Sequence, residues 1–285
     1  MTSCSSWSFS LGWRAATAVL AALLLWLPVA AQESAWREIA GGLELGTFKL
    51  DLDTPVGDST VVVLRIDPTE WELDLLSVKT TTDGKGMTAR QWRTSQGLVA
   101  AINAGMFATD YSTHIGLMAC DGDTNNPNAN HYRSVAAFKP RREGVAPFRF
   151  FDLDEDSIGN IRKDYRCLVQ NLRLVKRPGE NRWAPQDKRW SEAALGEDSA
   201  GNILFIFSRS PYSMHDLNKA LLRLPIALVA AQHLEGGPEA QLSVSLGDFD
   251  LELFGSYETN FNETDLNATA WPIPNVLGIH PRSAE

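Results

Sequence analysis

A nearly unbroken apolar run that stops at a carboxylate and two glycines constrains this chain more than any other feature. Residues 225–244 read PIALVAAQHLEGGPEAQLSV, and the first half has the length and composition of a buried β-strand. The run ends at Leu234-Glu235-Gly236-Gly237-Pro238, where glycine and proline redirect the backbone. The pattern predicts a buried strand that delivers the Glu235 carboxylate to a tight turn.

This turn has two interpretations. Gly236 and Gly237 carry no side-chain bulk and can adopt positive φ, so a ligand can approach the backbone closely beside Glu235. The alternative is that Glu235 simply begins an exposed hairpin turn. His233 lies two residues earlier and, in a regular strand, should share the face of Glu235, where it would orient or tune the acid. A buried histidine with satisfied hydrogen bonds is the alternative for His233.

A second apolar run ends in the same way. Residues 98–103 read LVAAIN, and the run is followed by Gly105 and Phe107. Enzymes built on sheets commonly place their chemistry in the loops that meet at strand ends. Asn103 is therefore a candidate site residue, and a turn residue that bonds its own backbone is the alternative.

Four short motifs, taken in order, resemble the phosphodiester glycosidase family. They are Asn103-Ala104-Gly105-Met106-Phe107, Gly116-Leu117, Arg189-Trp190-Ser191 and Leu234-Glu235-Gly236-Gly237. The resemblance spans residues 99–279. The family pattern has Asp where this chain has Glu235, and a Gln-Ser-Gly-Pro-like segment where this chain reads Gln170-Asn171-Leu172-Arg173. The second departure weakens the case for a substrate contact from that segment.

The resemblance implies hydrolysis of a sugar 1-phosphodiester at the bond between C1 and the phosphate oxygen. Glu235 would place its carboxylate near C1, and Arg189 would bind the phosphate through its planar guanidinium. Asn103 would bond a sugar hydroxyl or a phosphate oxygen. The other expected substrate-binding residues are Gly105, Gly116, Ser191, Gly236, Gly237 and His233. If the resemblance is set aside, the sequence predicts a surface arginine in a salt bridge as readily as a phosphate-binding arginine at position 189. No metal or cofactor is predicted.

A mechanism with two acids needs a second carboxylate, and Asp110, Asp121 and Glu239 are unranked candidates. Retention or inversion depends on the separation of the two carboxyl groups, so the sequence does not predict it. A secreted phosphosugar-binding protein without catalysis is the rival interpretation. It is favoured by Glu235 in place of Asp, by the altered segment 170–173, and by Pro238 and Glu239 after the glycines.

The first 31 residues predict a secretory signal peptide. Arg14 is their only charged residue, and residues 15–31 form an apolar stretch that ends in small residues before Gln32. We expect cleavage after Ala31, a domain over residues 32–285, and a secreted or periplasmic location. An uncleaved membrane anchor is the alternative, because 17 residues are near the lower limit of a bilayer span.

The net charge limits the classes of partner, and the cysteines indicate the cellular compartment. The net charge of −9 becomes −10 once Arg14 is removed, and dense Lys/Arg clusters are missing, which argues against nucleic acid as a partner. Cys120 and Cys167 remain after cleavage, and an oxidising compartment would allow them to pair. Two buried free thiols are the alternative.

Strand and helix signals predict an α+β fold, a single β-rich mixed domain with a few helices. Helices are expected over residues 87–96, capped by a Thr or Asp that precedes Met87, and over 213–224, capped by Ser213. Besides the run that begins at Pro225, strands are expected at residues 59–67, 71–79, 98–103, 135–139, 148–153, 168–175, 203–207, 241–246, 249–254 and 271–279.

Three details of this arrangement can be tested. Strand 59–67 should pair with strand 71–79, and the proline-containing strand 271–279 should lie at a sheet edge. Residues 108–132 should form a long polar loop. Asp121, Asp123 and Asn125 follow the alternation of calcium loops, but the glycine and the final glutamate are missing, which favours a solvated loop.

Overall fold

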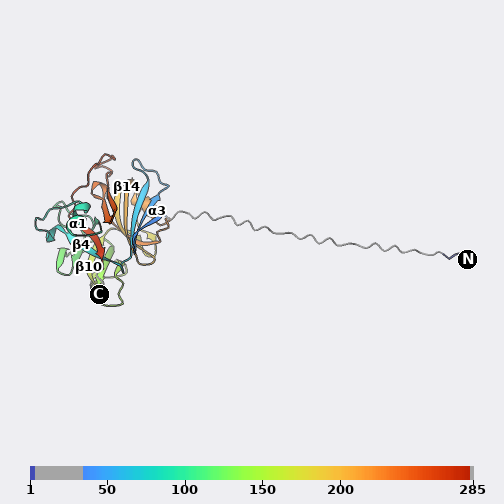
Figure 1. Ribbon diagram of the computed structural model, residues 1–285, viewed down its shortest axis with the longest axis horizontal. Coiled ribbons are helices and arrows are strands. Elements are labelled where there is room, and N and C mark those ends of the chain that lie inside the picture. Colours follow the sequence, from blue (N-terminus) through green and yellow to red (C-terminus); the bar gives the residue numbers. More distant parts are fainter. Residues whose placement is uncertain (4–34, 283–285) are drawn as a thin grey trace. The chain divides into compact units, whose positions relative to one another are not determined.

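Strands dominate the computed structural model, which describes residues 1–3 and 35–282 (Figure 1). The described residues 35–282 form one compact unit with an α+β fold, as predicted. The expected signal peptide, residues 1–31, lies outside the described residues except for its first three. Among the helices that the structure describes, none combines the length and apolarity needed to cross a membrane.

The largest sheet has eight strands and carries the run that ends at Glu235. In spatial order it consists of β1 (Trp36–Ala40), β2 (Leu43–Lys49), β3 (Thr60–Ile66), β14 (Ile203–Tyr212), β13 (Trp190–Asp198), β15 (Leu228–Gly236), β11 (Arg173–Lys176) and β12 (Glu180–Asn181). Neighbouring strands in it are antiparallel. The central strand β15 starts three residues later than the predicted start at Pro225.

Two five-stranded sheets complete the domain, again with antiparallel neighbours. One has the order β17 (Phe249–Phe254), β16 (Gln241–Leu246), β5 (Ala100–Asn103), β18 (Asn275–Pro281) and β4 (Trp71–Ser77). The other has the order β7 (Asp123–Asn126), β6 (Met118–Cys120), β10 (Tyr165–Asn171), β8 (Ser134–Pro140) and β9 (Phe148–Asp152).

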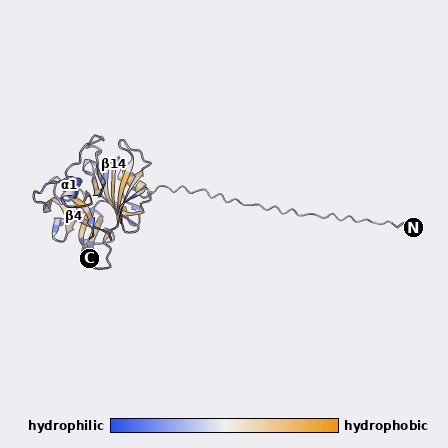
Figure 2. Ribbon diagram, in the orientation of Figure 1, coloured by the Kyte–Doolittle hydropathy of each residue, from blue (hydrophilic) through white to orange (hydrophobic). Residues whose placement is uncertain are grey.

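All three sheets contribute to one hydrophobic core. Phe205 of the large sheet, Ile102 and Leu277 of the second sheet, and Phe138 of the third belong to the same buried cluster. Figure 2 shows hydrophobic residues concentrated on the strands, β14 among them. Burying these side chains removes apolar surface from water at about 25 cal/mol per Å², which is the main driving force for closing the sheets on one another.

Three short α-helices cover outer faces of the sheets: α1 (Ala89–Ser95), α2 (Ile158–Asp164) and α3 (Met214–Leu221). Leu217 of α3 packs with Ile206 and Ala231 against the large sheet. Its central strands are thus buried on both faces, which explains why β14 and β15 begin with continuous apolar runs instead of alternating. The 3-10 helices are η1 (Val78–Thr80) and η2 (Gly237–Glu239).

Both predicted helices are present, and α3 begins at its predicted cap, whereas α1 begins later than predicted because its cap lies inside the range 87–96 instead of before Met87. Thr88 forms a capping box with Gln91 at the start of α1, and the Ser213 hydroxyl accepts the Asp216 amide at the start of α3. Helix α2 was not predicted, because its seven residues are mostly polar and show no apolar stripe.

Three predictions about strand arrangement are wrong. Residues 168–175 form parts of two strands in different sheets, β10 and β11, and the chain crosses between the sheets at Leu172. Strand β3 pairs with β2 and β14, whereas β4 pairs with β18 in another sheet. β18 is not an edge strand, since β4 and β5 flank it and the prolines at 272 and 274 precede it.

The excursion over residues 108–132 is anchored instead of loosely solvated. The buried Asn125 amide donates to Ser77 Oγ at 2.7 Å and to Asn275 Oδ1 at 3.1 Å, and its oxygen accepts the His114 amide at 2.7 Å. Strands β6 and β7 lie within this segment, and a disulfide joins Cys120 of β6 to Cys167 of β10. The calcium-like alternation therefore reflects an Asn that fixes the loop to the second sheet.

Candidate active site

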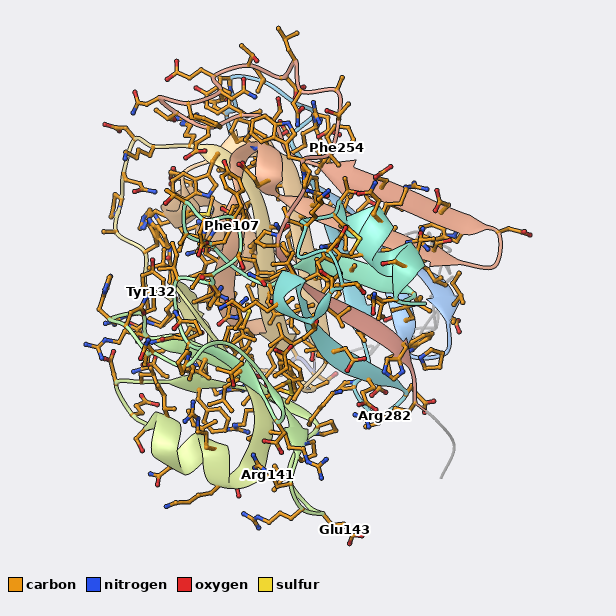
Figure 3. The ribbon with its side chains drawn as sticks, turned by 90° about the vertical axis from the view of Figure 1, so that its left-hand side faces the viewer. Phe107, Tyr132, Arg141, Glu143, Phe254 and Arg282 are labelled. Carbon is orange, nitrogen blue, oxygen red and sulfur yellow. A yellow bond between two sulfur atoms is a disulfide. The ribbon has the colours of Figure 1, made fainter. Side chains whose placement is uncertain are left out.

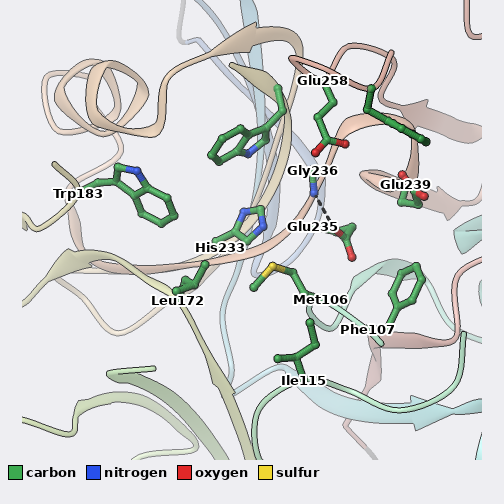
Figure 4. Close-up of a pocket in the computed structure, with 12 residues that line it drawn as sticks. Met106, Phe107, Ile115, Leu172, Trp183, His233, Glu235, Gly236, Glu239 and Glu258 are labelled. Carbon is green, nitrogen blue, oxygen red and sulfur yellow. Dashed lines mark hydrogen bonds between the residues drawn. The ribbon is translucent and has the colours of Figure 1, made fainter. Parts of the chain in front are cut away.

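A cavity of about 480 Å³ opens where β15 ends (Figure 4). It is lined by Met106, Phe107, Ile115, Leu172, Trp183, Trp190, His233, Glu235, Gly236, Glu239, Glu258 and Phe261. Aromatic and aliphatic side chains form most of the wall, and three carboxyl groups and one imidazole supply the polar groups. This combination of a largely apolar wall with few convergent polar groups is typical of a small-molecule site.

Glu235 reaches the cavity because it is the penultimate residue of β15, where it pairs with Ala193 of β13. Its Oε1 accepts the amide of Gly236 at 3.0 Å (Figure 4). Burial raises the pKa of Glu235 to about 8, and the nearby charge of His233 offsets only part of that shift. Glu235 thus titrates above its ordinary range, as acids and bases in active sites often do.

His233 and Glu235 both line the cavity, but the register of β15 shifts between them, since Glu235 pairs with Ala193 and His233 with the adjacent Ala194, so the regular alternation behind the prediction does not hold here. The His233 side chain is buried, and its Nδ1 bonds both carboxylate oxygens of Glu192 at 2.8 and 2.9 Å. The ring nitrogen left for a ligand is therefore Nε2. The two interpretations of His233 are compatible, because a buried and hydrogen-bonded imidazole also lines the cavity.

Two tryptophans and Glu192 hold the His233 ring. Trp190 and Trp183 pack edge-on against the ring, with centroid distances of 6.0 and 6.5 Å. Trp190 Nε1 donates to Glu192 Oε2 at 2.8 Å. Burial lowers the pKa of His233, but the charge and hydrogen bond of Glu192 outweigh it and raise the pKa overall. Burial also raises the pKa of Glu192, so the pair retains a shared proton to higher pH than a free histidine.

Two further carboxyl groups face the cavity. Burial raises the pKa of Glu239, which lies in η2, to about 7, and burial also raises the pKa of Glu258. Of the three candidates for a second acid, only Glu239 lines the cavity. Asp110 is exposed and caps its own loop by accepting the Thr113 amide, and Asp121 forms an ion pair with Arg141. The sequence offered no signal for Glu258, which lies in an irregular segment.

Asn103 and Ser191 lie beneath the site and do not line it. The buried Asn103 amide donates to the Glu239 carbonyl at 2.9 Å and accepts the Gln241 amide at 2.7 Å, so it fixes the turn that carries Glu239. Ser191 Oγ donates to the Arg209 carbonyl and accepts the amide of Tyr257, the residue before Glu258. Both side chains support the segments that present carboxylates.

Arg189 does not reach the cavity. Its guanidinium donates to the Asp53 carbonyl at 3.2 Å, and its backbone bonds Thr259. The expected convergence of the Asn103 amide, the Arg189 guanidinium and the Glu235 carboxyl is therefore wrong, since only Glu235 lines the cavity. Arg189 precedes β13, where its bonds to Asp53 and Thr259 hold it, whereas Trp190 and Glu192 within the strand contact His233.

A family model for phosphodiester glycosidases matches residues 96–280 of the 285-residue chain. The chain belongs to the phosphodiester glycosidase family. This is the family whose motifs the sequence resembles, and the matched range contains every candidate site residue.

Solved structures share the fold of this phosphodiester glycosidase. The catalytic domain of zebrafish N-acetylglucosamine-1-phosphodiester alpha-N-acetylglucosaminidase, auto-inhibited by pro-peptide, superposes with a TM-score of 0.60 at 16% identity, over 86% of each chain. A hypothetical protein from Synechocystis superposes with a TM-score of 0.53 at 14% identity, over 85% of this chain and 62% of that one. No curated protein matches the chain.

The glycines of this phosphodiester glycosidase allow close packing. A Cβ on Gly105 would lie 2.2 Å from Asn171 Oδ1, and one on Gly116 would lie 2.4 Å from the Gln170 carbonyl. A Cβ on Gly236 would lie 2.6 Å from the Trp190 ring. Gly237 has φ +62°, and a Cβ there would lie 2.8 Å from Glu258 Oε2. Of these four glycines, only Gly236 lines the cavity, so the others act by letting its walls approach one another.

Proposed function

We propose that this protein hydrolyses a sugar 1-phosphodiester by breaking the bond between C1 and the phosphate oxygen. The observation that carries the proposal is the Glu235 carboxyl at the end of β15, in a cavity that also presents the His233 imidazole. Water adds its oxygen to C1, the electron pair of the broken bond leaves with the phosphomonoester, and a proton is released from the water. The products are the free sugar and the phosphomonoester.

The leaving group explains why a strong general acid is not required. A phosphomonoester leaves as a stable anion, unlike a sugar alkoxide, so the site must chiefly stabilise charge. Ionised Glu235 would serve the cationic, oxocarbenium-like C1 as nucleophile or as base for water. Glu239 and Glu258 face the same cavity and are the candidates for a second acid.

His233 is the better candidate than Arg189 for contact with the phosphate. His233 lines the cavity with Nδ1 held by Glu192, and Glu192 raises the pKa of the imidazole, which favours the cationic form. Arg189 would have to leave Asp53 and turn toward the opposite face of the strand. The aromatic rings of Trp183 and Trp190 would provide flat surfaces for a sugar ring.

The proposal is tested by finding which bond breaks. The zebrafish neighbour is named for N-acetylglucosamine 1-phosphodiester, so this compound is the first substrate to try. In ¹⁸O-labelled water, cleavage at C1 is expected to place the label in the released sugar, as measured by mass spectrometry. Label in the phosphomonoester would instead indicate attack at phosphorus. No release from a panel of sugar 1-phosphodiesters would favour the binding protein without catalysis.

We also propose that the protein is exported to a secreted or periplasmic location after removal of residues 1–31. The apolar stretch 15–31 supports this, and so does the Cys120–Cys167 disulfide, because such bonds persist in oxidising compartments. N-terminal sequencing of the protein from the exported fraction is expected to begin at Gln32. A chain that starts at Met1 and sediments with membranes would support the uncleaved anchor.

A further inference from the structure

A groove rich in cationic side chains adjoins the cavity. It has a volume of about 350 Å³, and its lining includes His131, Arg133, Arg173 and Arg182. The groove and the cavity share two wall residues, Leu172 and Trp183, so they lie on either side of one boundary. The groove comes from the end of the 108–132 excursion and from strands β11 and β12 with their following loop.

The groove is also electrostatically connected to the site. Tyr132 lies in its wall, and Figure 3 shows this residue at the surface between the sheets. The pKa of Tyr132 is raised by burial and by the charge of Glu235, which places the phenol within electrostatic reach of the proposed catalytic carboxyl. A ligand that spans the shared boundary would therefore meet Glu235 on one side and arginines on the other.

The two hollows have opposite charge. Among the described residues that line the cavity, three are glutamates and neither lysine nor arginine occurs, whereas the groove carries three arginines. A sugar 1-phosphodiester also has an uncharged part and a charged part, since the sugar is neutral and the phosphate is an anion. The cavity supplies neither lysine nor arginine for the phosphate, whereas the adjoining groove supplies three arginines.

Two of the groove arginines are available to a ligand. Arg173 is only 14% exposed and is held by Asp152 and Asp154, so it acts structurally. Arg133 is 52% exposed and lies 3.5 Å from Asp154, and Arg182 is 40% exposed and pairs with Glu180. Exposed pairs of this kind contribute only about 0–1 kcal/mol, so a phosphate can replace them. Arg binds phosphate through two parallel hydrogen bonds.

We propose that Arg133 and Arg182 bind the phosphomonoester part of the substrate, so that the sugar occupies the cavity and the leaving group occupies the groove. The assignment of the sugar to the cavity and of the phosphomonoester to the groove rests on the proposed function. His233 would contact the phosphate from the cavity side of the shared boundary, and the two arginines would contact it from the groove side.

Binding tests the groove without any turnover. Phenyl phosphate serves as the probe in titration calorimetry at pH 7 and low salt, with the full-length protein and the double variant Arg133→Gln/Arg182→Gln. The loss of charge-assisted bonds is expected to raise the Kd about tenfold or more. Arg142→Gln is the matched control, because Arg142 is 67% exposed and pairs with Asp164 outside the groove. An unchanged Kd in the double variant, or no binding by the unmodified protein, would overturn the proposal.

Kinetics separate this inference from the proposed function. The double variant is expected to raise KM for a sugar 1-phosphodiester about tenfold with little change in kcat, because the arginines bind substrate and transition state alike. Hydrolysis that is unaffected in the double variant would refute the groove and leave the function standing. Binding of phenyl phosphate through the arginines, without hydrolysis of any sugar 1-phosphodiester, would refute the function and leave the groove standing.

Discussion

Glu235→Gln is expected to lower kcat/KM on a sugar 1-phosphodiester by about 10²- to 10⁴-fold, the range typical of losing a positioned acid or base. Gln keeps the shape of the side chain and its bond to the Gly236 amide, but it cannot ionise. Because burial raises the pKa of Glu235 to about 8, the rising limb of the kcat/KM–pH profile of the unmodified enzyme should lie near pH 8, and the falling limb should follow loss of the His233 proton. Steady-state kinetics between pH 5 and 9 measure both effects.

The matched control is Glu143→Gln, which changes an exposed carboxylate in the turn between β8 and β9, far from Phe107 in Figure 3. This control should keep full activity. An active Glu235→Gln enzyme would show that Glu235 is not the catalytic carboxylate. Glu239→Gln and Glu258→Gln, assayed beside it, would rank the two candidates for the second acid.

Thermal unfolding of Glu235→Gln provides a readout that does not depend on the substrate. The pKa of Glu235 is raised by burial from 4.5 to about 8, so the folded protein holds a proton that the unfolded chain has released. The free energy of unfolding contributed by this group therefore falls as pH rises between these two values. The Tm of Glu235→Gln should exceed that of the unmodified protein at pH 9, and the difference should shrink toward pH 4.

Glu192→Gln should reduce kcat/KM on phosphodiesters by about 10²-fold, although Glu192 does not line the cavity. Glu192 acts through His233 and is a positioning residue. Without its charge, burial dominates and the pKa of His233 falls, so the imidazole is neutral at pH 7 and attracts phosphate less. The falling limb of the pH–rate profile should therefore move to lower pH, and NMR titration of the imidazole should show the same shift.

Glu197→Gln is the control for this variant. Glu197 is also a buried carboxylate of β13, but it bonds the Phe150 amide and Arg177 and lies away from the cavity. This variant should lose stability without moving the pH profile. The double variant Glu192→Gln/His233→Gln should be no less active than His233→Gln alone. Additive losses would show that Glu192 acts independently of His233.

The family pattern has aspartate where this chain has Glu235, and this difference was one reason to consider a binding protein without catalysis. A carboxylate that is one methylene longer lies more than about 1 Å away from the shorter one, and such a displacement can cost about 100-fold in rate. In this chain the longer side chain is held by the Gly236 amide at the end of a strand buried in the large sheet. Glu235 is thus positioned, and its variant decides between an enzyme and a binding protein.

Local features of the sequence were sufficient for many elements of the fold. The apolar run before Glu235 forms β15, and Ser213 begins α3 because capping depends on residues only three positions apart. These predictions required no knowledge of distant partners.

Pairing between distant strands decided the rest. The motif at residues 189–191 suggested Arg189 and Ser191, but the register of β13 against β15 turns Trp190 and Glu192 toward His233 instead. A shift of one residue exchanges the two faces of a strand, and motif spacing does not specify which face is buried.

The sequence by itself determined that a carboxylate ends a buried strand in a β-rich α+β domain of the phosphodiester glycosidase type. Only the tertiary structure decided that Glu258 joins Glu235, that Glu192 supports His233, and that arginines adjoin the cavity across Leu172 and Trp183. The physical reason is that capping and side-chain alternation act between near neighbours, whereas a cavity forms where three sheets bury their apolar faces against one core.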